Sequence, residues 1–394
     1  MTDKLRVRVY NVHFGDAVLV TVPDRTSAGN PITRRILIDV GNAPLVASAI
    51  GGDDSVFQPV IDDILDQLGG KALDLYVLTH EHLDHAQGLL HADRKLFPAG
   101  EFQQKFKVRH VWLTPSAHPD YYDMPGHEKA KKQFTLAAEQ YRAISSYLRT
   151  TAVELMPSFQ SLLANNNPQS TKACVEYIRN LNPKRTHYVH RGVSLTGKHG
   201  FRDVKFSIWA PEEDTSEYYG RFQPLGLLEA PAAGATAAEP PSPPAGVDLG
   251  AFLNLVESRT LGIADNLLTI DAAANNTSIV FLLEWRGWKL LFAGDAEIRS
   301  WKTMNRQGVL SPVHFLKVSH HGSHNGTPEA DLFEALLPKK PSDNRKRRAA
   351  VSTWTETYGG IPHTPTDNRL KSRAALFSTL DDQTALFFEL EFKG

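Results

Sequence analysis

Four potential metal ligands lie within six consecutive positions of the chain. His80, His82, Asp84 and His85 directly follow the apolar run 73–78. Residues i and i+2 of a strand point to the same side, so His80 and His82 can bind one ion. Beyond the bend, Asp84 and His85 can reach a second ion. Imidazole and carboxylate groups suit zinc, manganese or iron, so the spacing favours a metal-dependent hydrolase over a polar loop with solvent-facing histidines.

A carboxylate follows another apolar strand late in the chain. Asp295 comes directly after the segment 290–293 and Gly294. At this position it can bridge two ions at the ~3.5 to 4 Å separation that two-metal hydrolysis uses. The alternative is a turn aspartate that caps a helix expected over 296–306. Because the histidine motif is present in the same chain, we favour the metal ligand.

Three further histidines follow the apolar strand expected over 313–318. They are His320, His321 and His324. We expect His320 to complete the second metal site. We expect His321 to face the substrate, donating a proton to the leaving group or a hydrogen bond to an oxyanion. Adjacent residues can exchange these two roles, and His324 is expected at the surface.

Two more residues are candidates for supporting roles. Asp39 ends the apolar segment 36–38 and can accept a hydrogen bond from a ligating imidazole, which would fix the orientation of that ring. A simple turn aspartate is the alternative. His363 lies in a loop between Pro362 and Pro365 and can contact metal or a substrate phosphate, or it can be an exposed loop residue.

The elements expected around these residues alternate between strands and helices, which predicts the α/β class with two mixed sheets and helices outside them. Strands are expected at 5–10, 17–22, 35–39, 73–78, 107–113, 204–210, 278–283, 288–293, 313–318, 349–353 and 385–392. Helices are expected at 60–68, 128–148, 172–180 and 328–337, the last with Pro328 in its first turn.

The chain is expected to be a single domain, 1–394, with two irregular parts. The range 102–182 is predicted to be a largely helical insertion beside the core, broken by the Asn-rich segment 165–168. The range 225–246 is rich in Pro, Ala and Gly and is predicted to be a mobile surface loop. After it, Asp248 can cap a short helix that runs towards Ser258.

The composition excludes several classes of protein. Lys and Arg number 43 against 44 Asp and Glu, so no global charge attracts nucleic acid or an acidic membrane. The one cysteine, Cys174, excludes an intramolecular disulfide framework and is expected to be a buried apolar residue. The chain has neither a signal core nor a membrane-spanning stretch, so we expect a cytoplasmic protein. A basic run over 339–348 can contact a polyanion or be a solvated loop.

These motifs resemble the metallo-β-lactamase superfamily, and more closely the hydrolase domain of ComEC-like DNA-uptake proteins. The resemblance rests on the segments 12–19, 37–39, 80–85, 276–280, 292–295 and 316–323. It implies an αββα sandwich with two divalent metal ions, zinc or manganese, at one edge. Many members have another histidine ligand before the strand that leads to the bridging aspartate, where this chain has Asn275 and Asn276. Water or Asn276 would then complete the first metal site. The membrane channel of the ComEC-like proteins is absent here.

Two cations and a bridging hydroxide best match attack on phosphorus, so the sequence favours a phosphodiesterase or nuclease with a phosphodiester substrate such as nucleic acid. In this hypothesis Asp84 and His321 act in catalysis, while Asp84, His85, Asp295 and His320 bind the second ion. One alternative is hydrolysis of an ester, lactone or β-lactam on the same centre. Another is a non-catalytic binding module stabilised by metal. The insertion can cover the cleft, recruit a protein partner or form an oligomer contact.

Overall fold

Two mixed β-sheets form the centre of the computed structural model, which describes residues 4–43, 53–151, 157–225, 262–354, 358 and 360–394. The first sheet has the order β13-β1-β2-β3-β4-β5-β6 and the second the order β12-β11-β10-β9-β8-β7. The first contains β1 (Lys4–Tyr10), β2 (Ala17–Arg25), β3 (Pro31–Val40), β4 (Leu75–Val77), β5 (Val111–Leu113), β6 (Thr186–Tyr188) and β13 (Phe387–Lys393). The second contains β7 (Val204–Ala210), β8 (Val280–Trp285), β9 (Trp288–Phe292), β10 (Phe315–Lys317), β11 (Arg348–Val351) and β12 (Ala375–Ser378).

Each sheet has an antiparallel half and a parallel half. In the first sheet β13, β1, β2 and β3 pair antiparallel, whereas β3, β4, β5 and β6 pair parallel. In the second sheet β7, β8 and β9 pair antiparallel, and β9, β10, β11 and β12 pair parallel. The carboxyl ends of parallel neighbours meet at one edge, so each sheet has an edge where loops from several strands gather.

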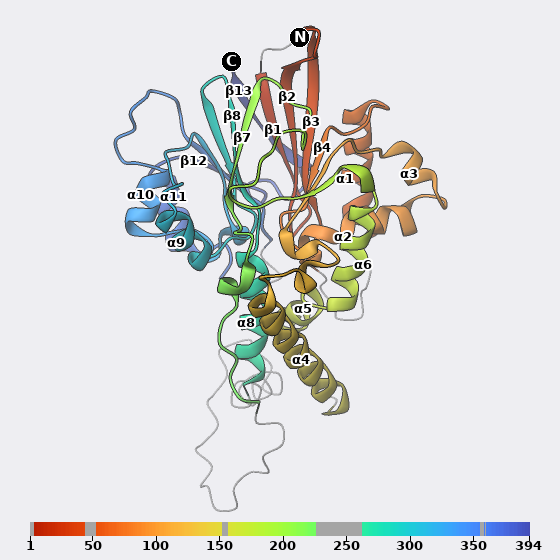
Figure 1. The fold of residues 1–394 in the computed structure, drawn as a ribbon. Helices are drawn as coiled ribbons and strands as arrows, with labels where there is room; N and C mark the ends of the chain where they lie inside the picture. Colours follow the sequence, from red (N-terminus) through yellow and green to blue (C-terminus); the bar gives the residue numbers. More distant parts are fainter. Residues whose placement is uncertain (1–3, 44–52, 152–156, 226–261, 355–357, 359) are drawn as a thin grey trace, which may run out of the picture.

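Helices cover the outer faces of both sheets (Figure 1). Those beside the first sheet are α1 (Asp54–Leu68), α2 (Leu83–His91), α3 (Glu101–Lys105) and α6 (Pro168–Arg179). Those beside the second sheet are α9 (Ile298–Arg306), α10 (Ala330–Leu336) and α11 (Thr364–Lys371). One buried apolar cluster lies between the sheets and contains side chains of both, such as Val20, Phe281 and Phe292. Two more clusters lie between each sheet and its helices.

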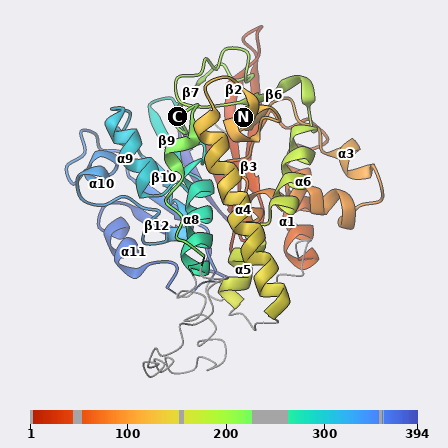
Figure 2. The ribbon, with the colours of Figure 1, turned by 60° about the horizontal axis from the view of Figure 1, so that its bottom comes forward.

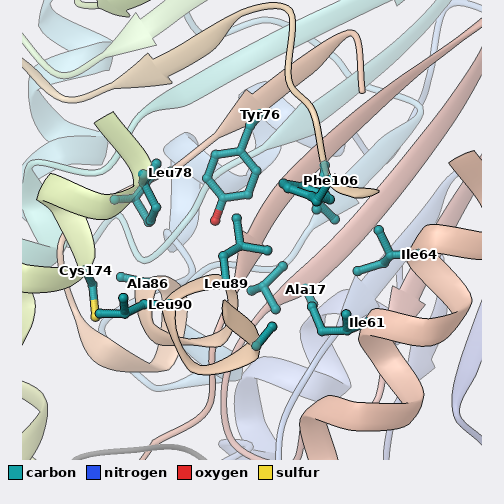
Figure 3. Close-up of a cluster of buried hydrophobic side chains, with 14 of the residues drawn as sticks. Ala17, Ile61, Ile64, Tyr76, Leu78, Ala86, Leu89, Leu90, Phe106 and Cys174 are labelled. Carbon is teal, nitrogen blue, oxygen red and sulfur yellow. The ribbon is translucent and has the colours of Figure 1, made fainter. Parts of the chain in front are cut away.

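The cluster beneath α1, α2 and α6 shows how the apolar pattern of the sequence fixes these helices. Ile61 and Ile64 of α1 point towards Leu89 of α2 and Tyr76 of β4 (Figure 3). Cys174 of α6 is buried in the same cluster, which confirms its prediction as a buried apolar residue. Full burial of an aliphatic side chain contributes roughly 1.5 to 3 kcal/mol, so these contacts rather than helix propensity hold the helices on the sheet.

Three further helices extend beyond one end of the two sheets (Figures 1 and 2). They are α4 (Glu128–Thr151), α5 (Pro157–Asn165) and α8 (Ile263–Asn276). They have a small apolar cluster of their own, which includes Ile144, Phe159 and Leu267. This extension lies at the end of the sheets where the potential metal ligands gather, so its helices can contribute residues to the site.

The structure confirms most expected elements and corrects several boundaries. The strand expected over 107–113 begins only at Val111, and the helix expected from Pro328 begins at Ala330. The range 102–182 is not wholly an insertion, because β5 within it pairs with β4 and β6 and α6 packs on the core. α1 begins at Asp54, before the expected 60–68. β6, β12, α8 and α11 were not predicted. Residues 226–246 and the expected helix after Asp248 lie outside the described residues.

Candidate metal centre

The potential ligands come from the carboxyl ends of parallel strands in both sheets. Asp39 ends β3, and His80 follows β4 in the first sheet. Asp295 follows β9, His321 follows β10, and Ser352 follows β11 in the second sheet. A backbone hydrogen bond from Ile279 to the carbonyl of Thr79 joins the two edges. Segments almost 300 residues apart in the chain therefore meet at one place.

The backbone at this place adopts conformations that are rare for residues with side chains. Asp39, His320 and His321 have φ values of 54°, 48° and 52°, all in the left-handed region. Such backbone conformations cost of order 1 to 3 kcal/mol each and gather at functional sites. A Cβ on Gly41 would lie 2.4 Å from the backbone of Asp84 and His85, so glycine allows the start of α2 to approach β3.

Six buried side chains form what we call the primary cluster: His80, His82, Asp84, His85, Asp295 and His321. His321 Nε2 lies 3.3 Å from both Asp84 Oδ2 and Asp295 Oδ2. His85 Nε2 lies 3.3 Å from Asp295 Oδ2 and 3.9 Å from Asp84 Oδ1. His80 Nε2 lies 3.1 Å from His82 Nδ1. Asp84 belongs both to the group with His80 and His82 and to the group with His85, Asp295 and His321.

The outward ring nitrogens of His85 and His321 face oxygen acceptors. His85 Nδ1 donates to Asp39 Oδ2 over 2.8 Å, and His321 Nδ1 donates to the Ser352 carbonyl over 3.0 Å. Asp39 in turn accepts from the backbone and the hydroxyl of Thr79, each over 2.7 Å. A neutral imidazole that donates through one nitrogen presents a lone pair at the other. Both rings therefore present Nε2 to the carboxylates of the primary cluster.

The other two imidazoles follow the same rule. His80 Nδ1 lies 3.2 Å from Thr79 Oγ1, whose own proton goes to Asp39, so this ring nitrogen is the donor. His82 Nε2 donates to Asn166 Oδ1 over 3.0 Å. The Asn166 amide is fixed because its nitrogen donates to the Leu162 carbonyl and to Asp271. The facing nitrogens, His80 Nε2 and His82 Nδ1, are then left as two lone pairs in close contact.

Several buried atoms of the primary cluster have no hydrogen-bond partner among the residues that the structure describes. They are Asp84 Oδ1, His85 Nε2, Asp295 Oδ1 and His321 Nε2. A buried acceptor without a donor costs about 1 to 3 kcal/mol, and more when it is charged. Carboxylate oxygens and imidazole nitrogens are the donors that zinc and manganese accept. The residues therefore fit divalent metal ions, which would satisfy these atoms together.

The pKa shifts in the primary cluster show that its carboxylates favour a bound positive charge. Burial lowers the pKa of His321, but Asp295 and Asp84 outweigh burial and raise it to about 10. Burial raises the pKa of Asp84, but His85 and His321 bring it below its usual range. The pKa of His80 is well below its ordinary value because of burial and of the neighbouring His85 and His82. The carboxylates thus attract a cation, whether a proton or a metal ion.

The positions of the two adjacent histidines are exchanged relative to the prediction. His321, not His320, lies against Asp84, His85 and Asp295, and it is fully buried. The left-handed backbone at both residues directs the two rings to different sides. His320 turns to Asp271 and Glu297 instead, and we call these three residues the second cluster. The geometry therefore favours the exchange of roles that the sequence left open, with His321 as the potential ligand in the primary cluster and His320 outside it.

The structure places the remaining predicted residues away from the primary cluster. The Asn276 amide donates to the Ala272 carbonyl and to Glu297, and it accepts from the Ser300 backbone, so it is not free to complete a metal site. His363 contacts Thr366, and its ring centroid lies 6.0 Å from that of His324. His324 is exposed, as predicted.

Several residues at the site were not predicted. Asn165 accepts a hydrogen bond from the Asp84 backbone, and Asn166 fixes His82, although the sequence indicated only a chain break there. Lys317 is buried and pairs with Asp16 over 2.7 Å, and Asp16 also accepts from the Ser352 hydroxyl. This network supports the segment whose carbonyl holds His321. The adjacent asparagines could have suggested polar contacts, but no pattern links them to His82.

Two hollows are candidates for a substrate site. A groove of about 1040 Å³ is lined by Lys302, His324, Tyr358 and His363, and by the acidic Glu329. It connects to the primary cluster through two aromatic rings, because Tyr358 packs on Phe14, whose ring centroid lies 4.3 Å from that of His321. The second is an apolar pocket of about 120 Å³ whose lining includes His82, Tyr122, Phe134 and Tyr219.

The basic run does not line the site. Arg347 is buried and pairs with Asp343, and the guanidinium groups of Arg345 and Arg348 lie over Trp288 and Phe392. The run precedes β11, whereas the primary cluster lies beyond the carboxyl end of that strand. These arginines therefore have structural contacts, and they do not add positive charge to the candidate centre.

No model of a protein family matches this chain, and no curated protein matches it either. Among the described residues, no helix combines the length and the apolar character needed to cross a membrane.

Proposed function

We propose that this protein is a metal-dependent phosphodiesterase or nuclease with a metallo-β-lactamase-type αββα sandwich. One observation carries the proposal: four buried imidazoles have their outward nitrogens bonded to oxygen acceptors. The inward nitrogens of His85 and His321 face two carboxylates with unpartnered atoms, and those of His80 and His82 face each other. Such an arrangement is costly without a cation and is typical of a built metal centre. The four layers of helix, sheet, sheet and helix support the same proposal.

The residues of the primary cluster would bind two divalent ions, zinc or manganese. His80 and His82 would bind one ion and His85, His321 and Asp295 the other, with Asp84 close to both. When bound, such ions supply Lewis acidity and an activated water for attack on phosphorus. Asp39 holds the His85 ring in place, and Asn166 does the same for His82. Asp84, common to both groups, is the carboxylate best placed to orient the attacking water.

The shape of the adjacent groove favours a phosphodiester over a small ester. At about 1040 Å³, the groove has room for more than one nucleotide-sized unit, and Lys302, His324 and His363 provide donors for phosphate oxygens. The alternative of ester, lactone or β-lactam hydrolysis is favoured by the apolar pocket beside His82, which suits an acyl or aromatic group.

Hydrolysis assays separate these two activities. We expect bis(p-nitrophenyl) phosphate to be hydrolysed in the presence of manganese or zinc, and a panel of lactones and β-lactams to be hydrolysed poorly. Turnover of the lactones alone would contradict the phosphodiester proposal. A defined single-stranded oligonucleotide and a cyclic dinucleotide would then separate a nuclease from a nucleotide phosphodiesterase.

Asp84→Ala and Asp295→Ala test the alternative of a non-catalytic, metal-stabilised binding module. A catalytic centre predicts loss of turnover while the protein stays folded, as measured by circular dichroism. A purely structural metal predicts loss of the fold together with the ion.

Partner binding through the helical extension stays a prediction. Phe134 and Leu136 of α4 and Leu268 of α8 are its exposed large apolar residues, at 42%, 36% and 51% of their full exposure.

A further inference from the structure

A second group of potential ligands lies beside the primary cluster and is not part of it. The second cluster combines Asp271 of α8, Glu297 of the loop after β9, and His320 of the short turn after β10, with their ligand atoms within 4.8 Å of one another. His320 Nδ1 lies 3.4 Å from Glu297 Oε1. Asp271 Oδ1 lies 3.6 Å from His82 Nε2, so the two clusters adjoin through His82.

The amide of Asn275 lies at the middle of the second cluster. Its nitrogen is 3.0 Å from Asp271 Oδ2, 3.0 Å from Glu297 Oε1 and 3.4 Å from His320 Nε2. Asn275 is 1% exposed, and its Oδ1 has no hydrogen-bond partner. Rotation of this amide by half a turn would bring Oδ1 to the place of the nitrogen, facing both carboxylates and the imidazole. That orientation is unfavourable among anions alone and favourable around a cation.

The charges of the second cluster are not balanced by basic side chains. In the parts of the chain that the structure describes, neither Asp271 nor Glu297 forms an ion pair with a lysine or arginine. Their hydrogen-bond donors are neutral amides, those of Asn166, Asn275 and Asn276. A cation placed among these side chains would be held by two carboxylates and one imidazole whose other partners are uncharged.

We propose that Asp271, Glu297, His320 and Asn275 form a third divalent-cation site, separate from the primary cluster. Three oxygen donors and one imidazole nitrogen suit manganese or zinc. Among the residues that the structure describes, Asn275 Oδ1 has no hydrogen-bond partner, and a cation at this site would give that buried oxygen a partner after rotation of the amide. The site would place a positive charge next to the centre, where the two carboxylates alone would repel an anionic substrate.

Metal counting on the full-length protein tests this site. We would saturate the protein with Mn²⁺, remove free ion by dialysis against a low buffered Mn²⁺ concentration, and count bound ions by atomic emission. We expect Glu297→Gln to hold one ion fewer than the wild type, or to bind that ion at least about tenfold more weakly. Asp271→Asn should give the same loss. Glu284→Gln, in β8 and paired with Lys205, is the matched control and should bind as the wild type does.

An Asp84→Asn variant separates this proposal from the proposed function. We expect it to lose ions of the primary cluster and to keep the ion of the second cluster, whether or not any substrate is hydrolysed. Circular dichroism confirms the fold of each variant. The third site is refuted if folded Glu297→Gln and Asp271→Asn bind as many Mn²⁺ ions, and as tightly, as the wild type. It is equally refuted if folded Asp84→Asn binds none.

Discussion

The primary and second clusters contain the same kinds of side chain but are supported differently. In the primary cluster every imidazole is fixed through its outward nitrogen, by Asp39, Thr79, Asn166 or the Ser352 carbonyl. In the second cluster the single imidazole of His320 has no such outer acceptor, and its side chain is 17% exposed. Support of this kind sets ring orientation in advance, so we expect the primary cluster to bind ions tightly and the second to exchange them.

The adjacent histidines provide the sharpest test of this difference. We expect His321→Asn to reduce phosphodiester hydrolysis by roughly 10³-fold, since a ligand contributes several kcal/mol of charge stabilisation. His320→Asn should reduce it by less than about tenfold, because His320 lies outside the primary cluster. Asparagine tolerates the left-handed backbone at both positions, so the two variants are matched. Equal losses of turnover would contradict the assignment of His321 to the centre.

Removing the outer support should have a smaller effect than removing a ligand. Asp39→Asn keeps the shape of the side chain but removes the charge that faces His85 Nδ1. We expect metal affinity to fall about 10- to 100-fold, as measured by competition with a fluorescent zinc chelator. Asp343→Asn, which changes a carboxylate that pairs with His314 and Arg347 far from the site, is the control. An unchanged affinity in Asp39→Asn would show that the ring needs no such support.

The helical extension reaches the centre through two adjacent amides, Asn165 at the end of α5 and Asn166 after it. Asn166→Ala frees His82 Nε2 and also removes a donor from Asp271. We expect about a tenfold loss of affinity, at the lower end of such outer contacts. The neighbouring Asn167 caps α6, so Asn167→Ala should lower the unfolding free energy by about 1 kcal/mol and leave ion binding unchanged. If both variants bind ions equally well, the extension does not support the site.

The sequence predicted the strands that lead to the site more reliably than the parts that complete it. β3, β8 and β9 are apolar runs that end at turn or polar residues, so the burial of these strands can be predicted from the sequence. β6 has only three residues, all half-buried, and β12 has four, of which one is exposed, so neither gives a clear pattern. α8 was missed although Ile263, Leu267 and Ile270 repeat at helical spacing.

The site itself was predictable where ligands crowd together and not where they depend on tertiary contacts. Four ligands in six positions signal a centre, and a carboxylate after a buried strand adds to it. Which of His320 and His321 joins the primary cluster depends on two left-handed backbone conformations, and the sequence pattern does not predict these conformations. Asn166 and Asp271 are common polar residues that reach the site through helix packing. The local pattern therefore indicated where potential metal ligands gather, and the fold decides which side chains meet there.

The smallest expected effect on stability concerns a pair of histidines that has no carboxylate beside it, in contrast to the histidines of the primary cluster. His110 Nδ1 lies 3.3 Å from His187 Nε2 in the first sheet, and burial, then His187 and Arg185, lower the pKa of His110 to about 4. Between pH 6.5 and 4, His110 therefore binds a proton in the unfolded chain but not in the folded protein. The free energy of unfolding is highest above this pH range and falls as the pH drops through it. Urea unfolding at pH 7.5 and 5.0, with EDTA present, should show about 1 kcal/mol less acid destabilisation in His110→Gln than in the wild type. An equal loss in both proteins would mean that His110 is readily protonated in the fold. Burial would then not be enough to keep a histidine neutral here, and the contrast with the carboxylate-bound rings of the primary cluster would lose its physical basis.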